Sequence, residues 1–294
     1  MQVHLVDGTY ELFRYFYSPG GGHENAAGEQ VGAVRGVMRS LVGMLEDGAT
    51  HLGVATDHVI ESFRNDLWPG YKTGEGVDPL LKAQFPWLED AVEAMGITVW
   101  AMVEVEADDA LGAAAEVAAA DGRVERAIIC TPDKDLAQCV GGKVLQFDRR
   151  AGQFRDAAGV VEKYGVPPES IPDWLALVGD SADGFPGLPG WGAKTAAAVL
   201  RSYGHLEDIP HAPGQWDVQG VRGVAKLAAT LEENYEHAQL FKTLATLRTS
   251  VDVGAVDEWE WTGPTAELTA WCERMDAPDV LRKLERLVEA RSRT

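Results

Sequence analysis

Short apolar runs alternate, through the first half of the chain, with stretches that read as helices. The runs at residues 3–7, 51–57, 97–101, 127–131 and 143–147 predict strands. Residues 31–45 and 80–95, whose apolar positions recur at helical spacing, and the alanine-rich residues 110–120 predict helices. Strands that alternate with helices predict an α/β fold with a mostly parallel, doubly wound sheet.

The pattern changes after residue 155. Residues 148–154 carry a turn signal that predicts a short hairpin, and from residue 160 the chain reads as helices separated by glycine and proline. We therefore predict a sheet-containing domain over residues 1–155 and a helical region over residues 156–294. Residues 210–220 are the best candidate for a flexible loop.

Composition is that of a soluble globular protein, with 46% hydrophobic and 24% charged residues in a chain of 294. No apolar run approaches the roughly 20 residues that span a bilayer, so we expect no membrane association. The first seven residues read as a strand and are too short and too acidic for a signal peptide. The cysteines Cys130, Cys139 and Cys272 form no CxxC pair, which favours a reducing cytoplasm.

Carboxylates stand where the predicted strands and glycine turns end. Nine form the candidate cluster: Asp7, Asp57, Glu106, Asp108, Asp109, Asp133, Asp135, Asp180 and Asp183. Ligands of an open α/β sheet gather beyond the carboxyl ends of its strands, so we expect these side chains to share one crevice. Such a cluster needs cations, and all-oxygen ligation suits Mg²⁺ or Mn²⁺ rather than zinc. Taken singly, Glu106, Asp108, Asp109 and Asp133 also fit a structural role at a helix N-terminus, and only the repeated placement at four strand ends favours a metal site.

A glycine- and proline-rich hinge follows this cluster. Residues 187–195 read Gly-Leu-Pro-Gly-Trp-Gly-Ala-Lys-Thr and lead into a predicted helix over residues 193–202. Glycines allow close backbone approach and a helix N-terminus directs amides at an anion, so the hinge is a candidate for binding a nucleic-acid backbone without reading its sequence. The candidate residues are Gly187, Gly190, Gly192, Lys194 and Thr195. A tight turn between two helices is the alternative.

The net charge of −20 and the sequence pI near 4.7 are unusual for a protein that binds nucleic acid. Metal ions on the acidic cluster would neutralise part of this charge, and screening over roughly 8–10 Å lets local basic residues act within an acidic surface. An acidic surface kept for solubility is the alternative. We expect DNA binding that is weaker and more salt-sensitive than that of a basic protein.

These motifs together resemble the 5′-nuclease superfamily, which includes bacterial 5′-3′ exonucleases, flap endonucleases and the N-terminal nuclease domain of bacterial DNA polymerase I. The resemblance covers residues 3–205 and rests on Leu5-Val6-Asp7-Gly8, Asp57, Ser62-Phe63-Arg64, Gly70-Tyr71-Lys72, Glu106-Ala107-Asp108-Asp109, Thr131-Pro132-Asp133-Lys134-Asp135-Leu136, Gly179-Asp180-Ser181-Ala182-Asp183 and the hinge. It implies a PIN-like α/β domain followed by a helix-three-turn-helix (H3TH) module. It also implies a structure-specific 5′-3′ exonuclease or flap endonuclease that acts on DNA.

The resemblance also implies roles for individual residues. One metal ion would be held mainly by Asp7, Asp57, Glu106 and Asp108, and a second would lie toward Asp109, Asp133, Asp135, Asp180 and Asp183. Two such ions stabilise the attacking and leaving oxygens of phosphodiester hydrolysis, which leaves a 5′-phosphate. Lys72, with Arg64 beside it, would stabilise charge on the scissile phosphate. Arg14 would contact the single strand.

Two further segments have counterparts in the family. Residues 64–83 would form an arch over the 5′ strand, and the hinge would bind duplex backbone, commonly with a K⁺ ion held by its carbonyls. Terminal nucleotides must leave the base stack to reach the metals, so the expected partners are DNA 5′ ends, flaps and nicks. No small-molecule cofactor is expected.

The chain departs from the family pattern at two places. The family often has an arginine just after the Tyr-Lys of the arch, whereas this chain has Thr73-Gly74-Glu75-Gly76. An acid there repels phosphate, so we expect weaker threading of 5′ flaps, with Lys82 offsetting part of the effect. The other departure is Gly184, which stands where the family usually has an asparagine.

Two other functions remain open from the sequence. A PIN-type ribonuclease shares the acids at the strand ends but lacks the hinge and the long arch, and a non-catalytic DNA-structure-binding protein would keep the fold. Trp259, Trp261 and Trp271 fit base-stacking platforms, although burial in a core is our preferred interpretation. No polymerase segment follows, so we expect a free-standing nuclease that serves replication and repair.

Overall fold

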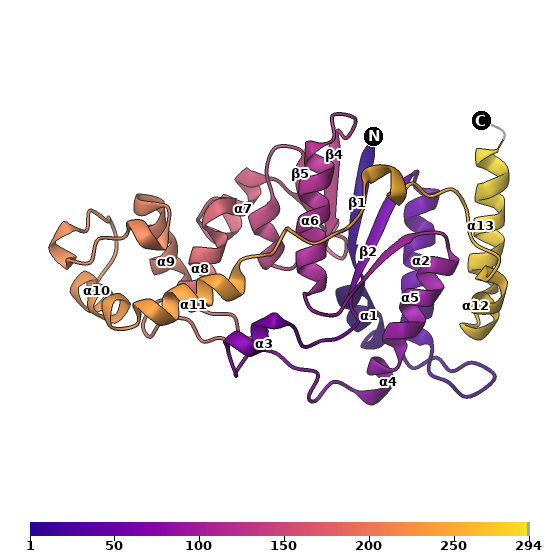
Figure 1. The fold of residues 1–294 in the computed structure, drawn as a ribbon, viewed down its shortest axis with the longest axis horizontal. Coiled ribbons are helices and arrows are strands. Elements are labelled where there is room, and N and C mark those ends of the chain that lie inside the picture. The colour runs from indigo at the N-terminus through magenta and orange to yellow at the C-terminus, as the bar shows by residue number, and fades with distance from the viewer. Residues whose placement is uncertain (293–294) are drawn as a thin grey trace.

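The structure is a computed structural model and describes residues 1–292. The molecule is elongated, with a sheet and its covering helices at the centre and right of Figure 1 and a group of helices at the left. The N-terminal strand and the last described helix both lie in the sheet-containing part, so the helical group is formed by the middle of the sequence.

Six strands form one sheet in the order β3-β2-β1-β4-β5-β6. The strands are β1 (Gln2–Asp7), β2 (His51–Asp57), β3 (Thr98–Met102), β4 (Arg126–Cys130), β5 (Val144–Asp148) and β6 (Gln153–Arg155). All neighbouring strands are parallel except β5 and β6, which form the predicted hairpin. The strand order reverses between β1 and β4, and the crevice beyond such a switch point is where ligands of this architecture bind.

Helices cover both faces of the sheet. On one face lie α1 (Gly8–Phe16), α2 (Gly32–Glu46) and α5 (Gln84–Ala94), and on the other lies α6 (Ala107–Ala120). The predicted apolar stripe of α2, which includes Val34, Met38 and Leu41, is fully buried. The alanine-rich sequence of α6 lets this helix lie close to the strands, because its buried face carries mostly single methyl groups.

The helical group has its own core. It contains α7 (Ala157–Tyr164), α8 (Ile171–Val178), α9 (Ala193–Tyr203), α10 (Val224–Glu233) and α11 (Tyr235–Ala245), with the short 3-10 helices Pro168–Ser170, Leu206–Asp208 and Pro213–Gln215. α8 packs along α11, and Phe185 and Phe241 stack between them. Residues 210–220 form an irregular segment in which Trp216 donates to the carbonyl of Pro210 at 2.6 Å.

After α11 the chain returns to the sheet-containing part, as Figure 1 shows. The return segment includes the 3-10 helix Val256–Trp259, and Trp259 packs edge-on against Trp100 of β3. α12 (Leu268–Arg274) and α13 (Pro278–Arg291) then cover α5 and α2. Trp259 and Trp261 are buried, as predicted, and each indole N–H donates to a backbone carbonyl.

The predicted fold class is confirmed, and the predicted strands agree with the structure to within a residue at each end. The sequence patterns did not predict α1. The arch segment is two short helices, α3 (Phe63–Leu67) and α4 (Pro79–Lys82), joined by irregular chain. Within residues 1–292, no helix has the length and apolar character needed to cross a bilayer.

Candidate metal centre

Asp7 is held at the end of β1 by the first turn of α1. It is the N-cap of that helix and accepts hydrogen bonds from the backbone N–H of Tyr10 at 2.8 Å and from the hydroxyl of Thr131 at 2.9 Å. The strand therefore passes into a helix without a loop, and this geometry fixes the carboxylate at the predicted crevice.

Asp57 and Glu106 are fixed by neighbouring backbone and hydroxyl groups. Asp57 ends β2 and accepts the backbone N–H of Ala107, at the start of α6, at 2.8 Å. Glu106 precedes α6 and accepts the hydroxyl of Ser62 at 2.6 Å. Asp108 lies in the first turn of α6, where its carboxylate faces the charges of Asp133 and Asp7.

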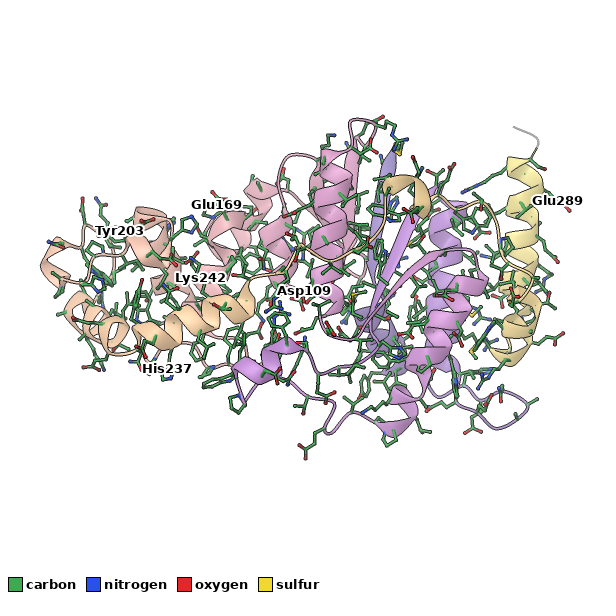
Figure 2. All side chains as sticks on the ribbon, in the orientation of Figure 1. Asp109, Glu169, Tyr203, His237, Lys242 and Glu289 are labelled. Atoms are coloured by element: carbon green, nitrogen blue, oxygen red, sulfur yellow. The ribbon has the colours of Figure 1, made fainter. Side chains whose placement is uncertain are left out.

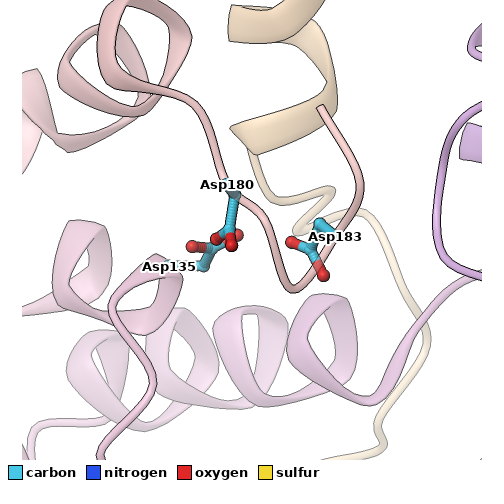
Figure 3. A group of neighbouring side chains, drawn as sticks. All are labelled: Asp135, Asp180 and Asp183. Carbon is cyan, nitrogen blue, oxygen red and sulfur yellow. The ribbon is translucent and has the colours of Figure 1, made fainter. Parts of the chain in front are cut away.

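Three further carboxylates converge beyond β4. Asp135 comes from the 3-10 helix Asp135–Cys139, and Asp180 and Asp183 come from the turn after α8 (Figure 3). One oxygen of each lies within 4.8 Å of the others. Oδ1 of Asp135 is buried and accepts no hydrogen bond from the described residues. A buried carboxylate oxygen without a partner, beside two others, fits a divalent cation.

Burial raises the pKa values of several of these acids. Burial and the charges of Asp57 and Asp133 raise the pKa of Asp7 to about 7, although its hydrogen bonds act in the opposite sense. Burial also raises the pKa of Asp57 above its ordinary value. Burial and neighbouring acids raise the pKa values of Asp108 and Asp135 well above the ordinary range. The cluster therefore disfavours its own negative charge unless cations enter it.

Lys72 supplies one of these cations. Its Nζ lies 2.7 Å from Glu106 and 3.2 Å from Asp183. Burial opposes the charge of Lys72, but Asp183 and Glu106 raise its pKa well above the ordinary value. Burial would likewise raise the pKa of Glu106, but Lys72 and Arg64 outweigh this effect and lower it. Lys72 is thus held charged at the edge of the cluster.

Arg64, predicted to stabilise charge on the scissile phosphate, is buried in a network of hydrogen bonds within the protein. It is 2% exposed and makes five hydrogen bonds: to Asp109 at 2.8 and 2.8 Å, to Glu106 at 3.1 Å, and to the carbonyls of Leu244 at 2.8 Å and Thr246 at 3.3 Å. A guanidinium has five N–H groups, so none remains for a phosphate. Arg64 instead joins the arch segment, α6 and the end of α11.

Asp109, predicted as a metal ligand, belongs to the same hydrogen-bond network as Arg64. Both of its oxygens pair with Arg64, and they also accept the backbone N–H groups of Glu106 at 2.9 Å and Arg248 at 2.8 Å. Asp109 lies where α6 meets the end of α11 (Figure 2). With two donors on each oxygen, this carboxylate has no position left for a metal ion.

The remaining predicted residues lie around the cluster. Asp133 is exposed and accepts the backbone N–H of Asp135 at 2.9 Å. Arg14 pairs with buried Glu11, and its guanidinium lies 4.3 Å from the ring centre of Tyr15. Lys82 ends α4, within the arch segment, and is exposed. The backbone N–H of Gly74 and the charge of Lys82 lower the pKa of Glu61, so Lys82, like Arg14, already lies near an acid.

The hinge residues fall into two groups. Gly190, Gly192 and Lys194 are exposed around the start of α9. No side-chain cap accepts a hydrogen bond from the first N–H groups of this helix. Thr195 lies in the first turn of that helix, partly exposed. Gly187 is buried, and a Cβ placed there would lie 2.3 Å from the backbone nitrogen of Gly179. Packing against the end of α8, rather than access to a ligand, accounts for this glycine.

Four residues contribute to the site although the sequence analysis gave them no role. Ser62 and Thr131 fix Glu106 and Asp7, Tyr71 donates to Glu106 at 3.3 Å, and Lys134 pairs with Asp180. All four stand inside the motifs that carry the family resemblance. Their position within those motifs was the available signal, but it could not say which partner each one has.

Two family models match this chain. The model described as 5′-3′ exonuclease, N-terminal resolvase-like domain, matches residues 2–165. The model described as 5′-3′ exonuclease, C-terminal SAM fold, matches residues 166–267. Together the two matches run from β1 to the segment that precedes α12.

Curated relatives of this chain include bacterial DNA polymerases. DNA polymerase I of Pseudomonas aeruginosa is 36% identical over 261 residues, which are 85% of this chain and 27% of the polymerase. DNA polymerase I of Bacillus subtilis is 34% identical over 255 residues, 85% of this chain and 28% of the polymerase. The chain thus spans little more than a quarter of the length of the relatives it matches.

Solved structures with the same fold include a 5′-exonuclease and a protein bound to a DNA substrate. The 5′-exonuclease of T5 with bound zinc superposes with a TM-score of 0.64 at 21% identity, covering 98% of this chain and 99% of that one. The catalytic core of Rad2 in complex with a DNA substrate gives a TM-score of 0.63 at 15% identity, covering 97% and 92%. At these identities the likeness concerns the fold.

The Arg64 network should be a large contributor to stability. We expect Arg64→Met to lower the free energy of unfolding by about 3–5 kcal/mol, because it leaves Asp109 buried without its countercharge. Arg39→Met is the matched control, since Arg39 also binds an aspartate through two 2.8 Å hydrogen bonds but does so at the surface. That variant should lose less than about 1 kcal/mol. Equal losses in urea denaturation of the two variants would contradict the structural role of Arg64.

The pH dependence of stability should report on the buried acids. The pKa of Asp7 rises from 3.8 to about 7 on folding, so between these values the folded metal-free protein binds the extra proton and its free energy of unfolding falls as pH rises. In EDTA, Asp7→Asn should therefore gain stability over the wild type, and this advantage should grow between pH 4 and pH 7. Thermal unfolding curves across this range would measure it, and a constant difference would refute the shift.

Proposed function

Since this chain belongs to the 5′-3′ exonuclease family, we propose that it is a structure-specific 5′-3′ exonuclease and flap endonuclease that hydrolyses DNA phosphodiesters in a metal-dependent reaction. The observation that carries the proposal is the convergence of Asp135, Asp180 and Asp183 within 4.8 Å. They stand beside further buried acids at the carboxyl ends of β1 and β2. This arrangement is costly for folding and is explained by a site for divalent cations.

The donor set favours Mg²⁺ or Mn²⁺. Every candidate ligand is a carboxylate oxygen, and Asp108 interacts electrostatically with Asp7 and with the acids Asp133 and Asp135. Asp7 and Asp57 would hold one ion with Asp108, and Asp135, Asp180 and Asp183 would hold the other, with Asp133 at the exposed edge. Both oxygens of Glu106 already have two donors each, so Glu106 would join the first set only when Lys72 leaves its Oε2 for a phosphate. Two ions at such a site stabilise the attacking and leaving oxygens of phosphodiester hydrolysis.

Lys72 is the residue that we propose acts on the substrate directly. Its ammonium group lies at the rim of the acidic cluster, is held charged by two acids and is 26% exposed, so it can contact a phosphate that approaches the cluster. A fixed cation there stabilises the charge that develops on the phosphoryl oxygens. Arg64 would not contact the substrate itself, because its hydrogen bonds hold Glu106 in place.

The exposed start of α9 is the proposed contact with duplex DNA. Gly190, Gly192 and Lys194 expose backbone N–H groups and one ammonium group there, and Thr195 adds a hydroxyl. We propose that the loop carbonyls hold a K⁺ ion when DNA binds. Contacts of this kind position the duplex without reading its sequence, so discrimination comes from access of a frayed 5′ end to the acidic cluster.

Replication and repair in the cytoplasm are the setting that we propose for this activity. The two relatives described above are named DNA polymerase I, and the part that matches this chain is about a quarter of the length of each. The three cysteines are unpaired, as a reducing compartment requires.

The first test is cleavage of a 5′-labelled flap substrate and of a nicked duplex with Mg²⁺, with Mn²⁺ and with EDTA. We expect metal-dependent release of short 5′ fragments. Asp135→Ala should reduce turnover by on the order of 100-fold or more, because loss of a metal ligand costs at least as much as loss of a residue that orients one. Duplex binding should persist. Asp90→Ala, an exposed acid on α5, is the control and should retain wild-type turnover.

Other outcomes would select the other functions. Cleavage of RNA but not DNA would favour a PIN-type ribonuclease. Intact duplex binding without cleavage in either metal would favour a non-catalytic DNA-structure-binding protein. Wild-type turnover by Asp135→Ala would refute the assignment of the ligand set.

Flap threading should be the weaker activity. Glu75 is exposed on the arch segment, where a negative charge repels the phosphates of a passing strand. We expect cleavage to fall as the 5′ flap lengthens, and Glu75→Arg to recover cleavage of long flaps about 10-fold with little change on a nick. A flap-length series compared between the two proteins measures this. Equal profiles would exclude Glu75 as the cause.

A further inference from the structure

Part of the arch segment is hydrogen-bonded to the turn that carries two of the acids. We call residues 68–72 the strap and residues 180–185 the acidic turn. The backbone N–H of Lys72 donates to the carbonyl of Asp183 at 2.9 Å, and the indole N–H of Trp68 donates to the carbonyl of Gly184 at 3.1 Å. The acidic turn is itself closed by hydrogen bonds between Asp180 and Phe185 at 2.8 and 3.0 Å. The strap therefore rests on a rigid support.

A glycine stands on each side of this contact. Gly184 has a φ of +83°, and a Cβ added to it would lie 2.0 Å from the carbonyl oxygen of Gly70 and 3.5 Å from the backbone nitrogen of Lys72. A Cβ on Gly70 would lie 2.7 Å from the indole nitrogen of Trp68. Because a backbone oxygen cannot yield as a flexible side chain can, any side chain at Gly184 would push the strap away from the acidic turn.

The strap also sets where the ammonium group of Lys72 can reach. The backbone of Lys72 is fixed on both sides, since its N–H is bonded to Asp183 and its carbonyl accepts the side-chain amide of Asn65 at 2.9 Å. Tyr71 beside it is 3% exposed and belongs to the core of the helical group. From this fixed backbone, Nζ lies between Glu106 and Asp183. A shift of the strap would therefore be transmitted to Nζ.

We propose that Gly184 is a positioning residue for Lys72. Its missing side chain lets the strap close on the acidic turn, and this closure places the ammonium group between the two sets of acids. The proposal gives a physical reason for the glycine at this position, where the resembling family usually has an asparagine. It rests on the proposed function, in which Lys72 is the cation that contacts the phosphate.

The test compares Gly184→Ala with Gly204→Ala. Gly204 has nearly the same φ, +82°, but a Cβ there would meet no atom within 4 Å, so it controls for backbone strain alone. We expect kcat of Gly184→Ala on a nicked duplex to fall by roughly 10- to 100-fold, because small displacements of a reacting group have effects of this size. KM should change little, and Gly204→Ala should keep the wild-type kcat.

A double-mutant cycle distinguishes positioning of Lys72 from damage to the acidic turn. If Gly184 acts through Lys72, then Gly184→Ala should lower kcat little further in a Lys72→Met background. If the alanine instead disturbs Asp183 as a metal ligand, the two effects should multiply. Trp68→Phe is a second, milder variant, since it removes only the hydrogen bond to Gly184 and should give the same non-additivity.

Hydrogen exchange gives a readout that does not depend on activity. In metal-free, DNA-free protein the amides of residues 70–72 should exchange faster in Gly184→Ala than in wild type or Gly204→Ala. Unchanged exchange, wild-type kcat in Gly184→Ala or multiplying effects in the cycle would each overturn the proposal. Absence of cleavage by the wild type would instead count against the proposed function, and the exchange data would still decide whether Gly184 sets the strap.

Discussion

Crowded negative charge is the constraint on which the arrangement of this protein depends. Acids from the ends of β1 and β2, from the start of α6 and from two turns form one cluster, and burial penalises their charge. Oriented hydrogen-bond donors and fixed cations in the fold offset part of this charge. Tyr10 and Thr131 donate to Asp7, and Lys134 pairs with Asp180. What remains uncompensated, such as the buried oxygen of Asp135, fits the divalent cations that we propose bind there.

The same compensation joins the two parts of the molecule. Arg64 lies on the arch segment, pairs with acids at the start of α6 and reaches the carbonyls at the end of α11. Lys72 joins Glu106 of the sheet-containing part to Asp183 of the helical part. The site is therefore assembled from both parts, and its charges also hold them together. A mutation that removes one cation would act on stability and on substrate chemistry at once.

The sequence predicted the parts of the fold that follow from periodicity. The strands and the helix α2 are strongly patterned, so their bounds were close to those observed. α1 was missed because it begins directly at Asp7, and one residue serves as strand end, helix cap and candidate ligand. The sequence also could not predict which charged residues pair with each other. Arg64 and Asp109 look like site residues in a motif, and only packing shows that they satisfy each other. Gly187 likewise stands in a motif that suggests contact with a phosphate, but in the structure it packs against the end of α8.

The return of the chain after α11 has a consequence for how the protein forms during synthesis. α13 packs on α2, and the pair Arg39–Asp279 joins residues 240 positions apart. The helical group is built from neighbouring stretches and can close early, whereas the apolar surface of α2 and α5 stays uncovered until α12 and α13 have left the ribosome. The nascent chain thus exposes an apolar helical face while the residues between α5 and α12 are being made. This protein is a candidate for chaperone protection at that stage, even though its finished surface is strongly acidic.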